Sequence, residues 1–151
     1  MLLSQLLTPQ RIRVPLTAAD KASVIRELVE AVVEGSPLSA DDLLQAVQER
    51  EQVLSTGIGH GVAIPHGRSG RLTDLRVSAG VARQPIEFGS IDGAPVRLVF
   101  LLVAPESEAG AHVKALSRIT RLVRQPLVRE RLIGAPSGED FHRYLREAEG
   151  L

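Results

Sequence analysis

Apolar residues recur every three or four positions in several parts of the chain, which is the spacing of the buried face of a helix. Leu28 and Val32 belong to one such stretch, and Leu43 and Val47 belong to a second. Similar patterns fill most of the C-terminal part of the chain. The predicted helices cover residues 22–33, 39–53, 111–123, 126–133 and 138–149.

The ends of the first two helices carry residues that are typical of helix caps. Thr17 is placed to cap the first helix, and Gly35 follows its last apolar position. Glycine favours a helix end because it readily adopts the left-handed conformation found there. Ser39 is the candidate N-cap of the second helix, and the acids Asp41 and Asp42 in its first turn suit the positive end of the helix dipole.

Four other stretches have the apolar patterns of strands. "IRVPL" alternates apolar and polar residues, whereas "VRLVFLLVA" is apolar at almost every position. A strand of the second kind is usually central, with both of its faces covered. The predicted strands cover residues 12–16, 62–64, 75–82 and 96–104.

The order of these elements predicts the fold class. Helices lie before, between and after the strands, which favours an α/β fold with a mixed β-sheet flanked by helices on both faces. A chain of 151 residues is long enough to bury a core without disulfides or metals. No internal repeat, low-complexity segment or linker interrupts it, so we expect a single domain over residues 1–151.

The composition narrows the range of partners. The 18 basic residues equal the 18 acidic ones, so we expect neither nucleic acid nor an anionic membrane surface as a partner. The absence of cysteine excludes disulfides, thiolate catalysis and cysteine-ligated zinc. The chain starts without the basic residues of a signal peptide, and it has no apolar stretch long enough for a membrane helix. We therefore expect a soluble, cytoplasmic protein.

The stretch "STGIGHGVAIPHGR" combines sharp bends with two imidazoles. Its glycines allow backbone conformations that are closed to other residues and the close approach of a partner group. Successive exposed N–H groups of such a loop bind anions. Pro65 restricts the backbone just before His66 and so holds that imidazole in place. The candidate phosphate-loop residues are Ser55, Thr56, Gly57, Gly59, Gly61 and Gly67.

His66 is the candidate nucleophile of this loop. A histidine with an ordinary pKa of about 6.5 is mostly neutral at physiological pH, and its free ring nitrogen can accept a phosphoryl group. The phosphoryl oxygens would need a cation and N–H donors. Arg50, just before the loop, and His112, at the start of a predicted helix, are the candidates for this. The sequence alone does not bring the three together, and each is also compatible with a purely structural role.

Other chemistries fit the loop less well. His60 and His66 could bind zinc together with His112 or His142, but their spacing matches no strong zinc pattern. We therefore expect no metal and no cofactor. The loop lacks the Gly-Lys-Ser/Thr of a P-loop and the third glycine of a dinucleotide fingerprint, and the chain contains no Gly-x-Ser-x-Gly elbow.

The loop and its surroundings resemble a known signature. "REQVLSTGIGHGVAIPHGR", with "HVKAL" from His112, resembles the active-site pattern of enzyme IIA of the fructose/mannitol type, from the bacterial phosphoenolpyruvate-dependent phosphotransferase system. The segment "QPIEFGSIDGAPVRLVFLLVAPES" is similar to the middle section of that family, so the resemblance covers almost the whole chain. This sequence has His60 where the family commonly has Asn, and Val113 where it has Leu.

The resemblance implies a three-layer sandwich, with helices on both sides of a mixed sheet, and a phosphoryl-transfer role. His66 would receive the phosphoryl group from a histidine phosphocarrier protein of the HPr kind. His112 would stabilise the phosphohistidine or the transition state, and Arg50 would bind phosphoryl oxygens or orient the site.

The family has a sugar-specific branch and a nitrogen-regulatory branch. In the first, the phosphoryl group passes to an enzyme IIB for sugar uptake; in the second, the phosphorylation state decides which regulatory targets the protein binds. The free-standing chain and its closing "LREAEG" resemble the nitrogen-regulatory branch, which we favour. A third possibility is an interaction module with this fold that is never phosphorylated. For docking of the carrier, the sequence offers Ile58, Val62 and Ile64 as an apolar rim around His66.

Overall fold

The apolar segment around Phe100 forms β6 (Val96–Pro105), the middle strand of a six-stranded sheet. The computed structural model describes residues 2–151. Leu98 and Phe100 pack into one buried cluster and Val99 and Leu101 into another, so both faces of β6 are covered. The prediction of a central strand without a polar face is therefore confirmed.

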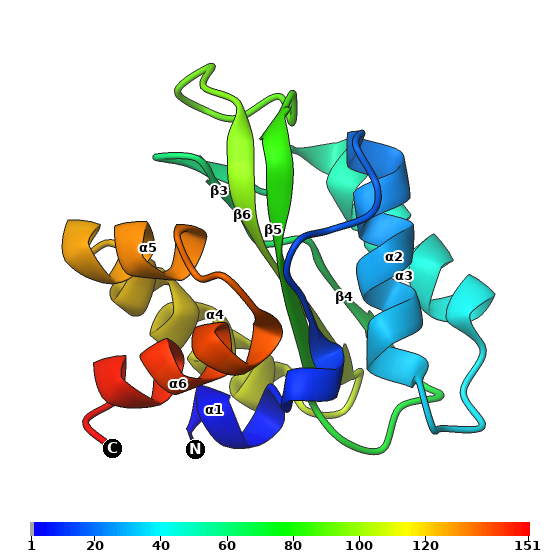
Figure 1. Cartoon of the computed structure of the whole chain (residues 1–151). Helices are drawn as coiled ribbons and strands as arrows, with labels where there is room; N and C mark the ends of the chain where they lie inside the picture. The colour runs from blue at the N-terminus through cyan, green and yellow to red at the C-terminus, as the bar shows by residue number, and fades with distance from the viewer. Residues whose placement is uncertain (1) are drawn as a thin grey trace.

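Two layers of helices enclose the sheet (Figure 1). The helices α2 and α3 bury their apolar faces in the cluster on one side, and α1, α4, α5 and α6 contribute to the cluster on the other. This arrangement confirms the predicted mixed sheet with helices on both faces. The helices are α1 (Leu3–Leu6), α2 (Lys21–Val33), α3 (Ala40–Val53), α4 (Ala109–Val123), α5 (Pro126–Ile133) and α6 (Gly138–Ala148).

The sheet has the strand order β1-β5-β6-β3-β2, and β4 also pairs with β6. β5 runs antiparallel to β6, β2 runs antiparallel to β3, and the other pairs are parallel. Ala63 of β3 lies opposite Val99, and His66 of β4 lies opposite Leu102. Both pairs have the same register, so β3 and β4 follow one another along the same edge of β6. The remaining strands are β1 (Ile12–Arg13), β2 (Gly57–Gly59), β3 (Val62–Ala63), β4 (His66–Ser69) and β5 (Arg76–Ile86).

The segment between the first strand and the first long helix differs from the prediction. The strand ends at Arg13 because the proline at position 15 has no N–H to donate to a ladder. α2 begins three residues later than expected for a cap at Thr17, and Asp20 is its N-cap, with its carboxylate accepting the N–H of Ser23. The N–H of Thr17 instead donates to Glu27.

Other element boundaries also differ from the prediction. Ser39 occupies the N-cap position of α3, but its side chain makes no capping hydrogen bond. α4 starts two residues earlier than predicted, and β5 continues to Ile86. The short helix α1 and the 3₁₀ turn η1 (Pro9–Arg11) were not predicted, because a single turn carries too little apolar periodicity.

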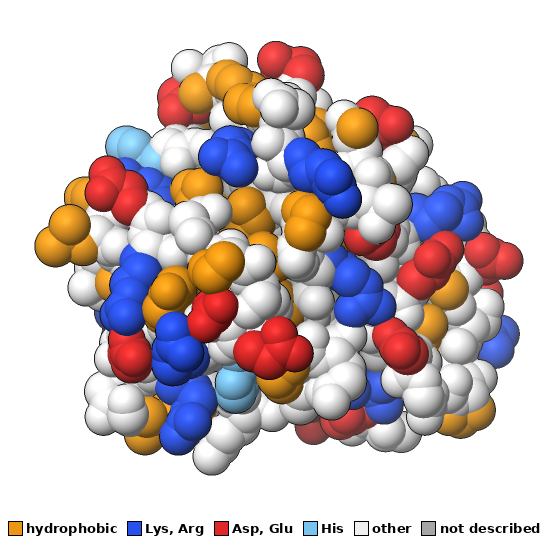
Figure 2. Space-filling model, in the orientation of Figure 1, with side chains coloured by type: hydrophobic (Ala, Val, Ile, Leu, Met, Phe, Trp, Pro, Cys, Tyr) orange, Lys and Arg blue, Asp and Glu red, His pale blue; other side chains and the backbone are white. Residues whose placement is uncertain are grey.

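Acidic and basic side chains are interspersed over the face seen in Figure 2, without a continuous basic patch. In residues 2–151, no helix is both long enough and apolar enough to cross a membrane.

Candidate functional site

His66 is the first residue of β4, and its ring is held by a backbone contact. Its Nδ1 lies 2.7 Å from the carbonyl oxygen of Ile64. Because a carbonyl oxygen can only accept a hydrogen bond, Nδ1 carries the proton and Nε2 keeps its lone pair. The segment therefore fixes both the orientation of the ring and its tautomer.

The ring of His112 lies edge-on against that of His66, with 5.2 Å between the centroids and 72° between the planes. His112 lies in the first turn of α4 and is 8% exposed. Within residues 2–151, its Nε2 atom is buried and has no hydrogen-bond partner. A buried nitrogen without a partner is costly, so a hydrogen bond to a bound group would stabilise this ring.

The side chains along β3 and β4 alternate between the two faces of the sheet. Val62 and Ile64 pack into the cluster beneath α4, and Ala63 packs into the cluster beneath α2 and α3. His66 continues the first set and so faces α4, where His112 lies. Gly67 faces α3 on the opposite side.

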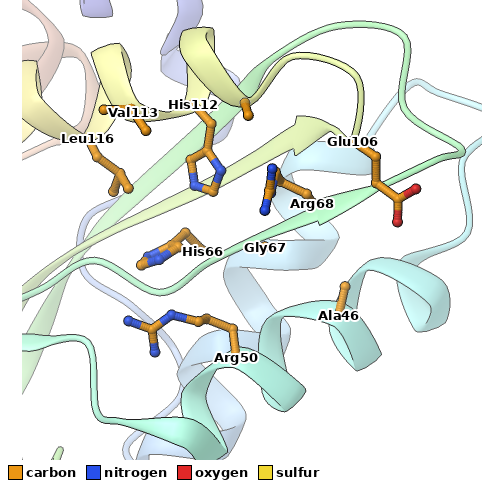
Figure 3. Close-up of a pocket in the computed structure, with 10 residues that line it drawn as sticks. Ala46, Arg50, His66, Gly67, Arg68, Glu106, His112, Val113 and Leu116 are labelled. Carbon is orange, nitrogen blue, oxygen red and sulfur yellow. The ribbon is translucent and has the colours of Figure 1, made fainter.

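Gly67 sets how closely α3 approaches the strand. A Cβ atom at this position would lie 3.1 Å from the backbone nitrogen of Val47 and 3.2 Å from the carbonyl carbon of Ala46. A side chain would therefore push α3 outward. Arg50 lies one helical turn beyond Ala46 and lines the same cavity as His66 (Figure 3). The missing side chain of Gly67 thus allows Arg50 to reach the histidines.

The cavity between α3, β4 and α4 has a volume of about 720 Å³. Its walls come from three elements that are far apart in the sequence. Figure 3 shows the two histidine rings and the guanidinium groups of Arg50 and Arg68 directed into it. The lining residues are Ala46, Arg50, His66, Gly67, Arg68, Glu106, Ala109, His112, Val113 and Leu116.

Both histidines of the cavity are held neutral at physiological pH. The pKa of His66 is lowered chiefly by burial and also by the nearby charge of Arg50, against the opposing effect of its bond to Ile64. The pKa of His112 is lowered to about 4, again mainly by burial, with further contributions from His66 and Arg68. A neutral His66 has the free lone pair that nucleophilic attack requires.

Of the six candidate phosphate-loop residues, all of which the structure describes, Gly67 alone lines the cavity. The hydroxyl of Ser55 donates to the carbonyl oxygen of Phe88, and that of Thr56 donates to Glu51. Gly57 is needed for close packing, since a Cβ there would lie 2.3 Å from Oγ of Ser90. Gly59 and Gly61 have φ values of 98° and 78°, which are strained for other residues.

A buried ionic contact fixes the start of the loop. The carboxylate of Glu51 accepts the N–H of Thr56 at 2.9 Å and its hydroxyl at 2.6 Å. It also pairs with Lys21 at 2.8 Å, and the ammonium of Lys21 donates to the carbonyl oxygen of Phe88. Glu51 thus ties the loop to the end of α3, next to Arg50.

The predicted apolar rim is wrong. Val62 and Ile64 are 1% and 3% exposed, and Ile58 is half-buried against the same core. The reason is that the three residues lie on β2, on β3 and directly after β3, where their side chains pack into the cluster beneath α4. Five of the large apolar side chains that are exposed instead are Val53, Leu54, Ile91, Val113 and Leu127.

Sequence reasoning missed two residues near the histidines, Glu51 and Arg68. Arg68 stands two positions after His66, so interpreting the segment as a strand would have placed both side chains on one face. Glu51 gave no such signal, because its partner Thr56 is brought close only by the fold.

The remaining histidines lie away from the cavity. His142 contacts the carbonyl oxygen of Ser4 at 2.8 Å, and His60 is exposed in a turn with a φ of 57°. Across residues 2–151, no group of three or more His, Cys, Asp or Glu side chains is arranged to hold a metal ion.

Nitrogen regulatory proteins and a fructose-specific EIIABC component are similar to this chain in fold or in sequence. The solved nitrogen regulatory protein IIA-Ntr of Neisseria meningitidis superimposes with a TM-score of 0.88 at 31% identity, over 95% of this chain and 98% of that chain. A nitrogen regulatory protein of Bradyrhizobium diazoefficiens is 36% identical over 87% of this chain and 86% of its own length. The fructose-specific EIIABC component of Bacillus subtilis is 32% identical over 91% of this chain, which spans only 22% of that protein.

One family matches almost the whole chain. Residues 5–148 match the family described as "Phosphoenolpyruvate-dependent sugar phosphotransferase system, EIIA 2", and the chain belongs to this family. Its members are phosphoryl-transfer components of that system. The resemblance drawn from the loop is therefore confirmed at the level of the family.

Proposed function

We propose that this protein carries a phosphoryl group on Nε2 of His66 and regulates partner proteins through its phosphorylation state. The observation that supports this most strongly is the hydrogen bond from Nδ1 of His66 to Ile64. It leaves the lone pair of Nε2 free on a ring that lines an open cavity. A histidine phosphocarrier protein of the HPr kind is the proposed donor.

The transfer step uses the tautomer that the backbone holds. The lone pair of Nε2 forms the new N–P bond, while the P–N bond of the donor's phosphohistidine breaks and its electron pair returns to the donor's ring. Nδ1 keeps its proton, so the phosphorylated ring of His66 becomes cationic. The hydrogen bond to the carbonyl oxygen of Ile64 is then charge-assisted and stronger.

His112 and Arg50 stabilise the transferred group in this account. The buried Nε2 of His112 donates to a phosphoryl oxygen and so gains the partner that it lacks. The guanidinium of Arg50, on the α3 side of the cavity, offsets the negative charge. Catalysis of phosphoryl transfer depends mainly on such positioning and charge stabilisation.

We favour the regulatory role because nitrogen regulatory proteins match this chain over most of both lengths. The second candidate is a sugar-specific enzyme IIA that passes the group to an enzyme IIB, and the similarity to a fructose-specific component supports it. The two differ in the acceptor. Rapid transfer from the phosphorylated protein to an enzyme IIB encoded by the same genome would favour sugar uptake, and the absence of any such acceptor would favour regulation.

The proposal is tested by incubating the purified protein with phosphoenolpyruvate, enzyme I and the phosphocarrier. The intact mass should rise by one phosphoryl group, and His66→Ala should abolish the increase. His60→Asn is the matched control, because His60 is exposed and lies outside the cavity. Labelling of the His66→Ala variant would refute the assignment, and no labelling of the wild type would favour an interaction module that is never phosphorylated.

A further inference from the structure

Arg68 shares the face of β4 that carries His66. The two residues are separated by one position, and alternate side chains of a strand point the same way. Both line the cavity beneath α4, and Figure 3 shows the guanidinium of Arg68 next to the ring of His112. Arg50 reaches the same space from α3 on the other side. The two guanidinium groups are therefore supplied by different elements.

Among residues 2–151, Arg68 has no partner of its own. In the part of the chain that the structure describes, its guanidinium forms no ion pair and no hydrogen bond, whereas the nearby Arg71 and Arg76 pair with Asp42 and Asp74. The one acidic residue of the cavity, Glu106, directs its carboxylate away from the histidine rings in Figure 3. Arg68 is exposed, so its charge is open to solvent and to a ligand that enters the cavity.

The buried Nε2 of His112 is an independent sign of that ligand. It needs a hydrogen-bond partner, and the charged or imidazole side chains that line the same cavity are His66, the two arginines and Glu106. The positive charge of Arg68 contributes to the low pKa of His112. An anion with several oxygens, such as phosphate, would satisfy the imidazole and both guanidinium groups at once.

We propose that Arg68 is a second phosphate-binding arginine of this site, and that the unphosphorylated cavity already binds inorganic phosphate through Arg68, Arg50 and His112. This inference rests on the proposed function for its biological meaning, but not for its test. Arg68 contacts the phosphoryl oxygens from the β4 side of His66, opposite to Arg50. The phosphohistidine is then held between two cations, which slows its hydrolysis by water.

The direct test is to titrate the unphosphorylated protein with inorganic phosphate and to monitor binding through the NMR signals of the His66 and His112 rings. Sodium chloride at equal ionic strength is the reference. The wild type should show saturable shifts beyond those caused by chloride. Arg68→Gln should weaken binding about tenfold or more, because a charge-assisted contact is lost. Arg83→Gln is the matched control, since Arg83 is exposed on β5 and does not line the cavity.

Equal affinity of the Arg68→Gln variant and the wild type would overturn the inference, and so would a wild type that responds to phosphate no more than to chloride. The titration needs no covalent step, so it stays informative even if His66 is never phosphorylated. In the phosphorylated protein, Arg68→Gln should shorten the lifetime of the phosphohistidine, and Arg68→Lys should restore part of it. An unchanged lifetime in Arg68→Gln would also count against the role.

Discussion

The rings of His66 and His112 meet edge-on, 5.2 Å apart between centroids, although 46 positions separate them in the chain. One ring offers a lone pair held by the backbone bond to Ile64, and the other offers a buried nitrogen without a partner. A phosphoryl group on Nε2 of His66 would enter the space beside His112. The negative charge of that group would raise the pKa of His112 and strengthen its role as a donor.

Replacing His112 should slow phosphoryl transfer without unfolding the protein. Loss of one preorganised donor to a developing oxyanion costs about 3 kcal/mol, which is roughly a hundredfold in rate. We expect a reduction of this size for His112→Ala and for Arg50→Gln, measured by rapid quench with the phosphorylated carrier as donor. His60→Asn should transfer at the wild-type rate. A reduction of tenfold or less in both variants would show that they do not act on the transition state.

The stability of the protein should fall as the pH drops from above the pKa of a free histidine toward about pH 4. In the unfolded chain His112 has a pKa near 6.5, whereas in the folded protein the value is lowered to about 4. Between these values the unfolded state binds more protons, so the free energy of unfolding decreases as the pH falls. The contribution is fully present above the unfolded pKa and is lost by about pH 4.

Urea unfolding at pH 7 and at about pH 5 measures this effect while most carboxylates are still ionised. His112 should account for a loss of about 2 kcal/mol over that interval. The drop should be smaller in His112→Gln, and His60→Gln should leave it unchanged. If the His112→Gln variant shows the same drop as the wild type, the folded protein does not hold this imidazole neutral.

Gly67→Ala should destabilise the protein by about 1–3 kcal/mol, the usual cost of overpacking. The added Cβ would meet the backbone of α3 at 3.1–3.3 Å, and moving that helix also moves Arg50. Transfer should therefore slow in the same variant. Gly110→Ala is the control, because a Cβ there has no atom within 4 Å. Equal urea midpoints for the two variants would mean that the space beside Gly67 can take a methyl group.

Glu51→Gln should destabilise the loop that precedes His66. Its carboxylate accepts two hydrogen bonds from Thr56 and pairs with Lys21, and its side chain is 7% exposed. The amide has no charge for an ion pair with the ammonium and only one oxygen acceptor, so we expect a loss of about 1–3 kcal/mol in the free energy of unfolding. Glu49→Gln, on the exposed side of the same helix, should change it by less than about 0.5 kcal/mol. An equal change in the free energy of unfolding for both variants would show that Glu51 does not have this structural role.

The layers of the fold could be predicted because their signals are local. Helical periodicity identified the long helices, and the run of apolar residues around Phe100 identified the central strand. β4 was missed because its four residues, beginning at His66, include a glycine and follow a proline, so they resemble a loop. Its strand character depends on pairing with β6, which is distant in the sequence.

The chemistry of the site could be predicted only as a set of candidate residues. The motif identified His66, His112 and Arg50 as candidates. Nothing local in the sequence shows that α3 packs against the backbone of Gly67, which allows Arg50 to reach the cavity. The prediction of an apolar rim around His66 was wrong for a related reason. Val62 lies on a strand that the fold buries, and burial depends on which elements cover it.

The central claim is that Nε2 of His66 receives the phosphoryl group. The most direct measurement is NMR of the phosphorylated protein with ¹⁵N-labelled histidine, in which phosphorus couples to the bonded ring nitrogen. Our account predicts coupling to Nε2 of His66, while Nδ1 keeps its proton and its bond to Ile64. Coupling to Nδ1 of His66, or to a ring nitrogen of any other histidine, would contradict it.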